Sequence, residues 1–190
     1  MAASETFVTQ LVPLLRSRGY KGSGSTFRKL EADSLFVVNF QRSRYGETFF
    51  INLGGQPTAI PDDGPFETTL KKLKDSECVF RARVGREWPR VLGPQDLMSV
   101  HAEMERAIPA FEENVSSLAD KVRTRDAAEL LRSLPFGCGS PRGAMHLARL
   151  CKVLGERERA HAYLEEGRKL AGPNGTVLLA ELRRMESEIG

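Results

Sequence analysis

The sequence has 190 residues, of which 41% are hydrophobic and 28% are charged, and its formal net charge is +3. These proportions are typical of a globular protein that buries a core without disulfides or metals, and the small net charge alone does not indicate nucleic-acid binding. No apolar run is long enough to cross a membrane, and the first residues, with Glu5 and no basic segment, are not typical of a signal peptide. We therefore expect a cytoplasmic protein.

The first predicted element is a helix over residues 4–18. Phe7, Leu11 and Leu15 recur at helical spacing, Pro13 is a candidate for a kink, and Gly19 follows as a stop signal. The next segment, KGSGST (21–26), is expected to be a flexible loop. A phosphate-binding loop follows a strand and opens a helix, whereas here the order is reversed, so phosphate binding is not expected.

Four strands are predicted after this loop. Their alternating apolar residues lie at 26–31, 35–42, 47–53 and 78–84. The segment between the last two strands is rich in Gly, Pro and Asp, which predicts an irregular loop over 54–65, followed by a short helix over 66–74. Because short turns join the first three strands, we expect a four-stranded antiparallel meander.

From Pro94 onwards every predicted element is a helix. An apolar stripe from Leu97 to Val122 predicts one long amphipathic helix, bent at Pro109. Shorter helices are predicted over 126–133, 144–154, 157–171 and 176–188, and the Gly-rich segment 136–143 is the candidate linker. The fold class is therefore α+β: a domain over 1–134, and a helical extension over 143–190 that consists of a hairpin and a capping helix docked on the first part.

The segment 144–173 resembles a single tetratricopeptide hairpin. Its members Leu147, Ala148, Cys151, Ala160 and Leu164 lie near the spacing of that repeat. An independent array usually needs at least about three units, so the resemblance implies only a pair of closely packed helices.

The hairpin VVNFQRSRYGETFFINLGG (37–55) carries the main functional lead. We expect Arg42 to pair with Glu47, and strand alternation then divides the side chains between two faces. The first face, expected to be the core beneath the first and the long helix, consists of Phe36, Val38, Phe40, Phe49, Ile51 and Leu53. The second consists of Val37, Asn39, Gln41, Thr48, Phe50 and Asn52, joined by Arg81 and Arg83 of the fourth strand.

This second face differs from an ordinary wet sheet surface, which shows Lys, Glu, Thr and Ser. Amides and arginines beside an aromatic ring are typical of a protein interface. Residues 1–94 also contain 14 Lys and Arg against 10 Asp and Glu, which weakly favours an acidic partner. Two alternatives stay open: the chain itself covers the face, or the face binds an anionic ligand or a nucleic acid, for which it offers few stacking rings.

Several short motifs recur in order over residues 5–90. They are RGYKGSGSTFRK (18–29), VVNFQRSRYGETFFINLG (37–54) and CVFRARVG (78–85), followed by Trp88. The pattern resembles a bacterial family, domain of unknown function 4304, whose recurring residues fall here on Tyr20, Lys21, Gln41, Ser43, Asn52 and Gly54. The resemblance implies a small α+β domain without an assigned activity, of a kind often found as immunity proteins beside secreted toxins.

Neither catalytic nor metal-binding patterns stand out. His101, His146 and His161 lack an acidic or cysteine partner at a spacing that would place both on one face. The cysteines Cys78, Cys138 and Cys151 form no CxxC pair, which predicts reduced thiols and no zinc site. We expect no cofactor and no enzymatic activity, and an uncharacterised enzyme is the remaining alternative.

We therefore expect a protein-binding module, in its most specific form an immunity or antitoxin-like protein that neutralises a toxin. The expected contact residues are Asn39, Gln41, Arg42, Asn52, Arg81 and Arg83. Nucleic acid is a weaker candidate partner, and no membrane partner is expected.

Overall fold

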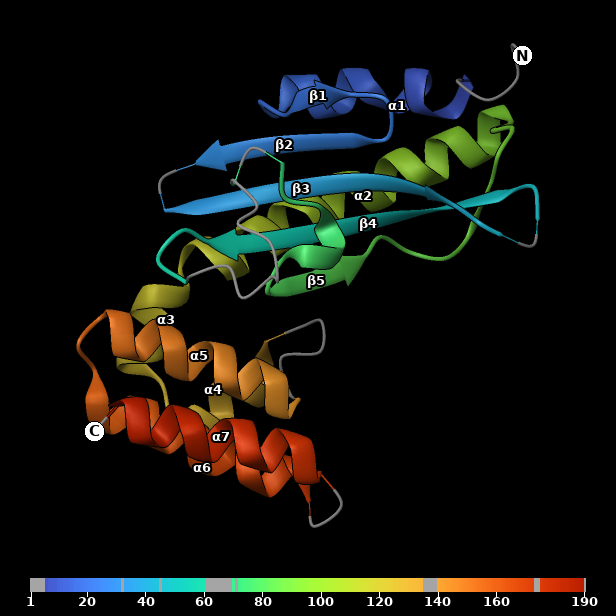
Figure 1. Cartoon of the computed structure of the whole chain (residues 1–190). Coiled ribbons are helices and arrows are strands. Elements are labelled where there is room, and N and C mark those ends of the chain that lie inside the picture. The colour runs from blue at the N-terminus through green and yellow to red at the C-terminus, as the bar shows by residue number, and fades with distance from the viewer. Residues whose placement is uncertain are drawn as a thin grey trace.

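The structure is a computed structural model that describes residues 6–31, 33–44, 46–60, 70, 72–134, 140–172 and 175–189. Its elements follow in the order α1 (Thr6–Ser17), β1 (Lys21–Ser23), β2 (Thr26–Glu31), β3 (Ser34–Arg42), β4 (Thr48–Pro57), η1 (Asp75–Glu77), β5 (Phe80–Arg83), β6 (Trp88–Pro89), α2 (Pro94–Ser116), α3 (Leu118–Thr124), α4 (Ala127–Ser133), α5 (Pro141–Val153), α6 (Arg157–Ala171) and α7 (Thr176–Ile189). Figure 1 shows α2 behind the sheet and the C-terminal helices below it. The expected α+β architecture is confirmed.

The sheet is antiparallel, with the strand order β1-β2-β3-β4-β5 and with β6 paired to the start of β4. The four predicted strands are present, and β1 and β6 are additional strands of the same sheet. β4 continues to Pro57, so the prediction that the irregular loop begins at residue 54 is wrong. β1 occupies the segment expected to be a flexible loop, so that prediction is wrong. Ser23 pairs with Thr26 around a two-residue turn, and Gly24 supplies the positive φ of 61° that such a turn requires.

The β3–β4 hairpin is shifted by two residues from the expected register, because Arg42 lies opposite Phe49 instead of Glu47. The cause is distant in sequence. Phe49 also pairs with Trp88 of β6, and the Arg90 N–H donates to the Glu47 carbonyl at 2.7 Å, which holds Glu47 outside the β3–β4 ladder. Because the shift is even, every side chain keeps its predicted face.

The core lies between the sheet and the helices α1 and α2. Phe7 of α1 stacks on Phe49 of β4 with ring centroids 4.0 Å apart. Met104 and Ile108 of α2 are fully buried in the same cluster as Phe36 of β3. The prediction that the first face of the hairpin packs on both helices is therefore confirmed.

The long apolar stripe is divided between two helices. α2 continues through Pro109 and ends at Ser116, so the single helix bent at Pro109 is a wrong prediction. Ser117 has φ −90° and ψ 10°, and its hydroxyl donates to the Glu113 carbonyl at 2.7 Å, a local bond that competes with helix continuation. The stripe still remains buried beyond the break, at Leu118 and Val122 of α3.

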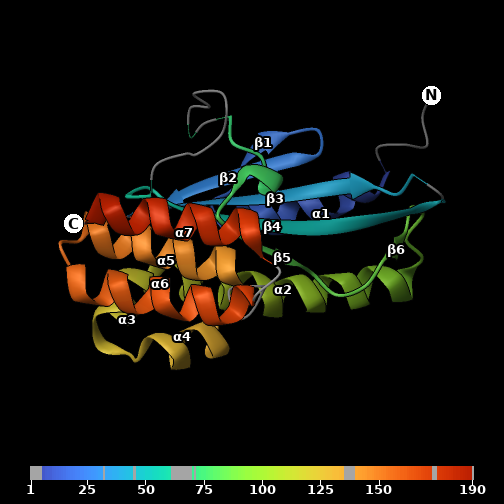
Figure 2. The same cartoon turned by 60° about the horizontal axis from the view of Figure 1, so that its bottom comes forward.

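The C-terminal helices form a packed group in which α5 contacts α6, α7 and α3, and α6 contacts α4 (Figure 2). A Cβ on Gly167 would lie 3.2 Å from Ala144 Cβ and 3.1 Å from a Leu182 methyl, so the glycine allows α5, α6 and α7 to approach closely. α5 begins three residues earlier than expected, because Ser140 caps it and Pro141 fits its first turn.

Some predicted features fall outside the described residues, namely most of the helix over 66–74, the first half of the linker over 136–143, and Cys138. Cys78 and Cys151 are buried free thiols, and burial raises the pKa of Cys151 to about 12. Within the described ranges, no helix is both long and apolar enough to cross a membrane.

Candidate functional site

Three neighbouring strands bring most of the expected contact residues together on one side of the sheet. Asn39 of β3 lies opposite Asn52 of β4, which in turn lies opposite Arg83 of β5. Alternation along each strand places the remaining members on this side. The amide–arginine face is defined as Asn39, Gln41, Phe50, Asn52, Arg81 and Arg83.

Asn52 is the centre of the amide–arginine face. Its Nδ2 donates to Gln41 Oε1 at 2.8 Å, and its Oδ1 accepts from Arg83 Nε at 3.3 Å. Asn52 is only 8% exposed, whereas Gln41 and Arg83 are exposed. Because both ends of the buried amide are paired, the side chain avoids the cost of an unsatisfied polar group. It also fixes the orientation of two exposed neighbours.

Arg83 is held from two directions. Its guanidinium carbon lies 4.0 Å from the centroid of the Phe50 ring, while its Nε is bonded to Asn52. Stacking of this kind orders a guanidinium and leaves the donors along its edge able to bind a carboxylate. The face therefore presents an arginine that is exposed and already ordered.

A hollow of about 460 Å³ lies beside this arginine, lined by Gln41, Asn52, Asp75, Ser76, Arg81 and Arg83 among others. Arg81 Nη1 donates to the Ser76 carbonyl at 3.4 Å. Partial burial raises the pKa of the Asp75 carboxyl, although backbone hydrogen bonds and Arg81 act in the opposite direction. Sequence reasoning missed Asp75 and Ser76, because only a non-local contact brings their segment to the sheet.

The other end of the same side of the sheet is covered by the chain itself. Leu35 and Val37 of β3 pack with Leu73 and Cys78 in a small buried cluster. Gly54 makes this possible, since a Cβ there would lie 2.7 Å from Cys78 Sγ. The segment from Leu73 to Cys78 thus covers one half of this side, and the amide–arginine face forms the other half.

Arg42 does not join the amide–arginine face, so its inclusion among the contact residues of that face is wrong. It alternates with Gln41 along β3 and therefore lies on the side of the sheet that carries α1. There it lines a cleft together with residues of α1. The signal was available in the sequence, because the alternation that assigns Phe40 to the core side assigns Arg42 to it as well.

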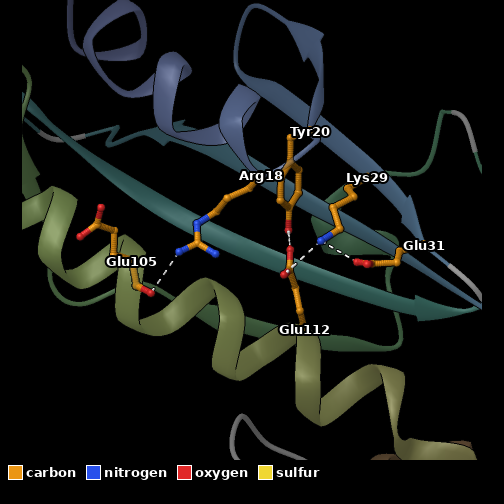
Figure 3. Close-up of polar contacts among 6 residues, drawn as sticks. All are labelled: Arg18, Tyr20, Lys29, Glu31, Glu105 and Glu112. Atoms are coloured by element: carbon orange, nitrogen blue, oxygen red, sulfur yellow. Dashed lines mark hydrogen bonds and ion pairs between the residues drawn. The ribbon is translucent and has the colours of Figure 1, made fainter.

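A partly buried polar cluster, in which only Tyr20 is fully buried, joins α2 to the core side of the sheet (Figure 3). The Tyr20 hydroxyl donates to Glu112 Oε1 at 2.7 Å, and Lys29 Nζ lies 3.2 Å from Glu112 Oε2 and 2.6 Å from Glu31 Oε2. Burial and the neighbouring Glu112 charge raise the pKa of the Tyr20 phenol, so the hydroxyl stays protonated. Tyr20 is only 2% exposed, and we interpret the cluster as a structural contact that stabilises the packing of α2 on the sheet.

The histidines lie on three different helices: His101 on α2, His146 on α5 and His161 on α6. His161 Nδ1 lies 4.0 Å from a Glu186 carboxylate oxygen. Burial, together with the charges of Arg142 and Arg81, lowers the pKa of His146 to about 4. No group of three or more His, Cys, Asp or Glu side chains in the described part of the chain could hold a metal ion.

An antiparallel meander with helices on one side and a half-open polar face on the other defines a small α+β protein. The chain belongs to the family described as Domain of unknown function (DUF4304), whose model matches residues 11–131. The match runs from α1 into α4 and so extends beyond the motifs of residues 5–90. Neither curated proteins nor solved structures give a match to the chain.

The residues that carried the resemblance to this family have clear positions in the structure. Gln41 and Asn52 are bonded to each other in the amide–arginine face. Tyr20 belongs to the partly buried polar cluster, and Gly54 lies beneath Cys78 in the covered half. Of these four, only Gln41 is exposed, so three of the motif residues are explained by the fold itself.

Proposed function

We propose that the chain is a protein-binding module and that the amide–arginine face is its contact surface. The observation that carries this proposal is Arg83, which is exposed yet ordered by the Phe50 ring at 4.0 Å and by Asn52. Ordered arginines beside aromatic rings are typical of the residues that dominate binding at protein interfaces. An ordered side chain also loses less conformational entropy when a partner binds.

The hollow beside Arg83 supports the same proposal. It offers a cation at Arg81, a carboxylate at Asp75 and the amide of Gln41 within one depression. These groups complement charged and polar side chains of a partner, which is the usual basis of register and specificity in protein complexes. They lie on β3 and β5 and on the segment packed against Gly54, so their positions are set by the folded core.

In its most specific form, the proposal is a bacterial, cytoplasmic immunity-like protein that neutralises a toxin by binding it. This form is supported by the context in which small α+β domains of this kind are met, beside secreted toxins. It predicts a secreted toxin encoded beside this chain. Co-expression of the chain should restore growth of cells that produce the toxin, and the Arg83→Ala variant should restore it less well.

Partner binding by alanine variants of the face tests the general proposal. The partner is captured by cross-linking to the full-length chain, purified, and titrated against Arg81→Ala, Arg83→Ala and the control Arg132→Ala, an exposed arginine of α4 outside the face. We expect each face variant to weaken binding by about 1–2 kcal/mol, with the control unchanged. Thermal unfolding should be unchanged for the control, and the face variants should lose no more than about 1 kcal/mol, since Arg83→Ala removes one hydrogen bond to Asn52.

Two results would contradict the proposal. If the face variants lose stability while partner binding is unchanged, the arginines serve the fold and not an interface. If the face variants instead lose affinity for a nucleic acid, with a steep dependence on salt concentration, the surface belongs to the nucleic-acid alternative.

A further inference from the structure

A cleft of about 890 Å³ opens on the α1 side of β3, between α1 and the β1–β2 turn. Its apolar lining is formed by Val8 and Val12 of α1, while the adjoining Phe7, Phe27 and Phe40 are almost completely buried. Val8 and Val12 are only partly buried, so the apolar surface continues to the rim. A cleft with this volume and lining can enclose apolar side chains of a ligand.

The polar groups of the cleft favour an anion. Arg16 of α1 and Arg42 of β3 both line it, and none of its described lining residues is acidic. Arg16 donates to the Tyr20 carbonyl at 3.2 Å and to the Gly22 carbonyl at 2.5 Å. Its guanidinium also lies 5.6 Å from the centroid of the Phe27 ring. Carbonyl groups orient a guanidinium without neutralising its charge, so the cleft combines apolar walls with fixed positive charge.

The cleft and the amide–arginine face meet at the end of β3. Gln41 lines both the cleft and the hollow beside Arg83. β2 does not extend along this part of β3, since its first residue, Thr26, pairs with Asn39. A single partner that wraps around the end of β3 can therefore contact both surfaces.

We propose that the cleft receives an acidic peptide segment of the partner protein. An apolar side chain of that segment lies against Val8 and Val12, and an adjacent Asp or Glu carboxylate faces Arg16 and Arg42. This inference rests on the proposed function, because it states the chemistry by which the same partner is recognised.

A random peptide library displayed on phage and selected on the full-length chain tests the inference. Enriched peptides are synthesised with a fluorophore, and their affinities are measured by fluorescence anisotropy. We expect the enriched sequences to combine Leu, Phe or Trp with neighbouring Asp or Glu. Enrichment of basic or uncharged sequences, or no enrichment at all, would overturn the inference.

A matched pair of variants places the peptide in the cleft. Thr9 is exposed and lines the cleft from the N-terminal half of α1, where a carboxylate is favourable to the helix. Thr9→Glu should weaken the selected peptides about tenfold or more by charge repulsion, whereas the isosteric Thr9→Gln should bind them as the original chain does. Arg42→Glu provides an independent variant with the same expected loss. Equal binding by all three variants would contradict the placement.

Two further comparisons separate the possible outcomes. If decanoate, a carboxylate with an apolar chain, binds the cleft while acidic peptides do not, the site belongs to lipid-like anions and the inference fails. If the whole partner loses affinity with Arg83→Ala but not with Thr9→Glu, the proposed function stands without the cleft. If the partner loses affinity with Thr9→Glu only, the cleft is its contact site and the amide–arginine face is not.

Discussion

The two halves of one side of the sheet use the same strands in different ways. In the covered half, Leu35 and Val37 of β3 are sealed beneath Leu73 and Cys78. In the open half, the next residues of that strand on this side are Asn39 and Gln41, and Gln41 is exposed. The change from apolar to amide residues therefore marks the point where the chain stops covering its own sheet.

The comparison teaches that the amides have an internal as well as an external role. Asn52 is nearly as buried as the apolar residues of the covered half, and it satisfies both ends of its side chain within the face. An apolar residue in its place would leave the Gln41 amide and the Arg83 guanidinium without this support. The open half is thus an ordered polar surface that owes its order to buried hydrogen bonds.

The largest expected effect comes from breaking the covered half. Gly54→Ala places a methyl group 2.7 Å from Cys78 Sγ and 2.8 Å from Asp75 Cα, so the segment before β5 must move away from the sheet. We expect unfolding in urea to show a loss of about 3 kcal/mol.

A glycine with open surroundings provides the control for this substitution. A Cβ on Gly46 would meet nothing nearer than Thr48 Oγ1 at 3.8 Å, so Gly46→Ala should change stability by less than about 0.5 kcal/mol. Equal effects at the two glycines would show that the covered half is not closely packed.

The partly buried polar cluster on the core side allows a buried hydrogen bond to be compared with the exposed hydrogen bonds of the open half. Tyr20→Phe removes the donor to the charged Glu112 and should cost about 2 kcal/mol in the same measurement. Because burial raises the pKa of this phenol in the folded protein, its contribution is complete below the ordinary tyrosine pKa of about 10 and declines as pH rises further. The difference between the two proteins should therefore shrink above that pH.

The control for this substitution is Tyr163→Phe. Tyr163 is fully buried, and its hydroxyl has no hydrogen-bond partner in the described part of the chain. Removing that hydroxyl should leave stability unchanged or slightly higher at neutral pH. A cost equal to that of Tyr20→Phe would mean that the bond to Glu112 contributes nothing specific.

The smallest expected effect lies in the open half. Asn52→Ala removes the bonds to Gln41 and Arg83, but both partners can turn to water, so stability should fall by about 1 kcal/mol. A double-mutant cycle with Arg83→Ala, followed by thermal unfolding, should give a coupling of about 0.5 kcal/mol or more. Strict additivity would show that Asn52 does not order Arg83.

The side of the sheet on which each hairpin residue lies could be predicted, because strand alternation is a local property. Alternation correctly grouped Asn39, Gln41 and Asn52 with Arg81 and Arg83. Applied consistently, it would also have placed Arg42 on the opposite side of the sheet. The register could not be predicted, since it depends on contacts between Glu47–Phe49 and residues 88–90. Such long-range pairings leave no periodic signal in the hairpin itself.

Local sequence patterns also could not predict which half of the sheet is covered by another segment of the chain. The segment with Leu73 and Cys78 contains too few apolar residues to predict that it packs on Gly54. β1 was missed for a related reason, because KGS has low strand propensity and forms a strand through its turn with β2. The amphipathic helices were predicted more accurately than the strands, because their periodicity extends over many residues. α6, for example, has the predicted bounds.

The break at Ser117 has a consequence for folding cooperativity. By its pattern, the stripe of α3 continues that of α2, yet α3 packs on α5, and Leu118 and Val122 share one buried cluster with residues of α5 to α7. A chain cut after α4 would expose these side chains to water. We therefore expect helices α5 to α7 and the sheet to unfold in a single transition, because α3 contacts both α5 and α2, which packs on the sheet, and loses its packing when either part unfolds.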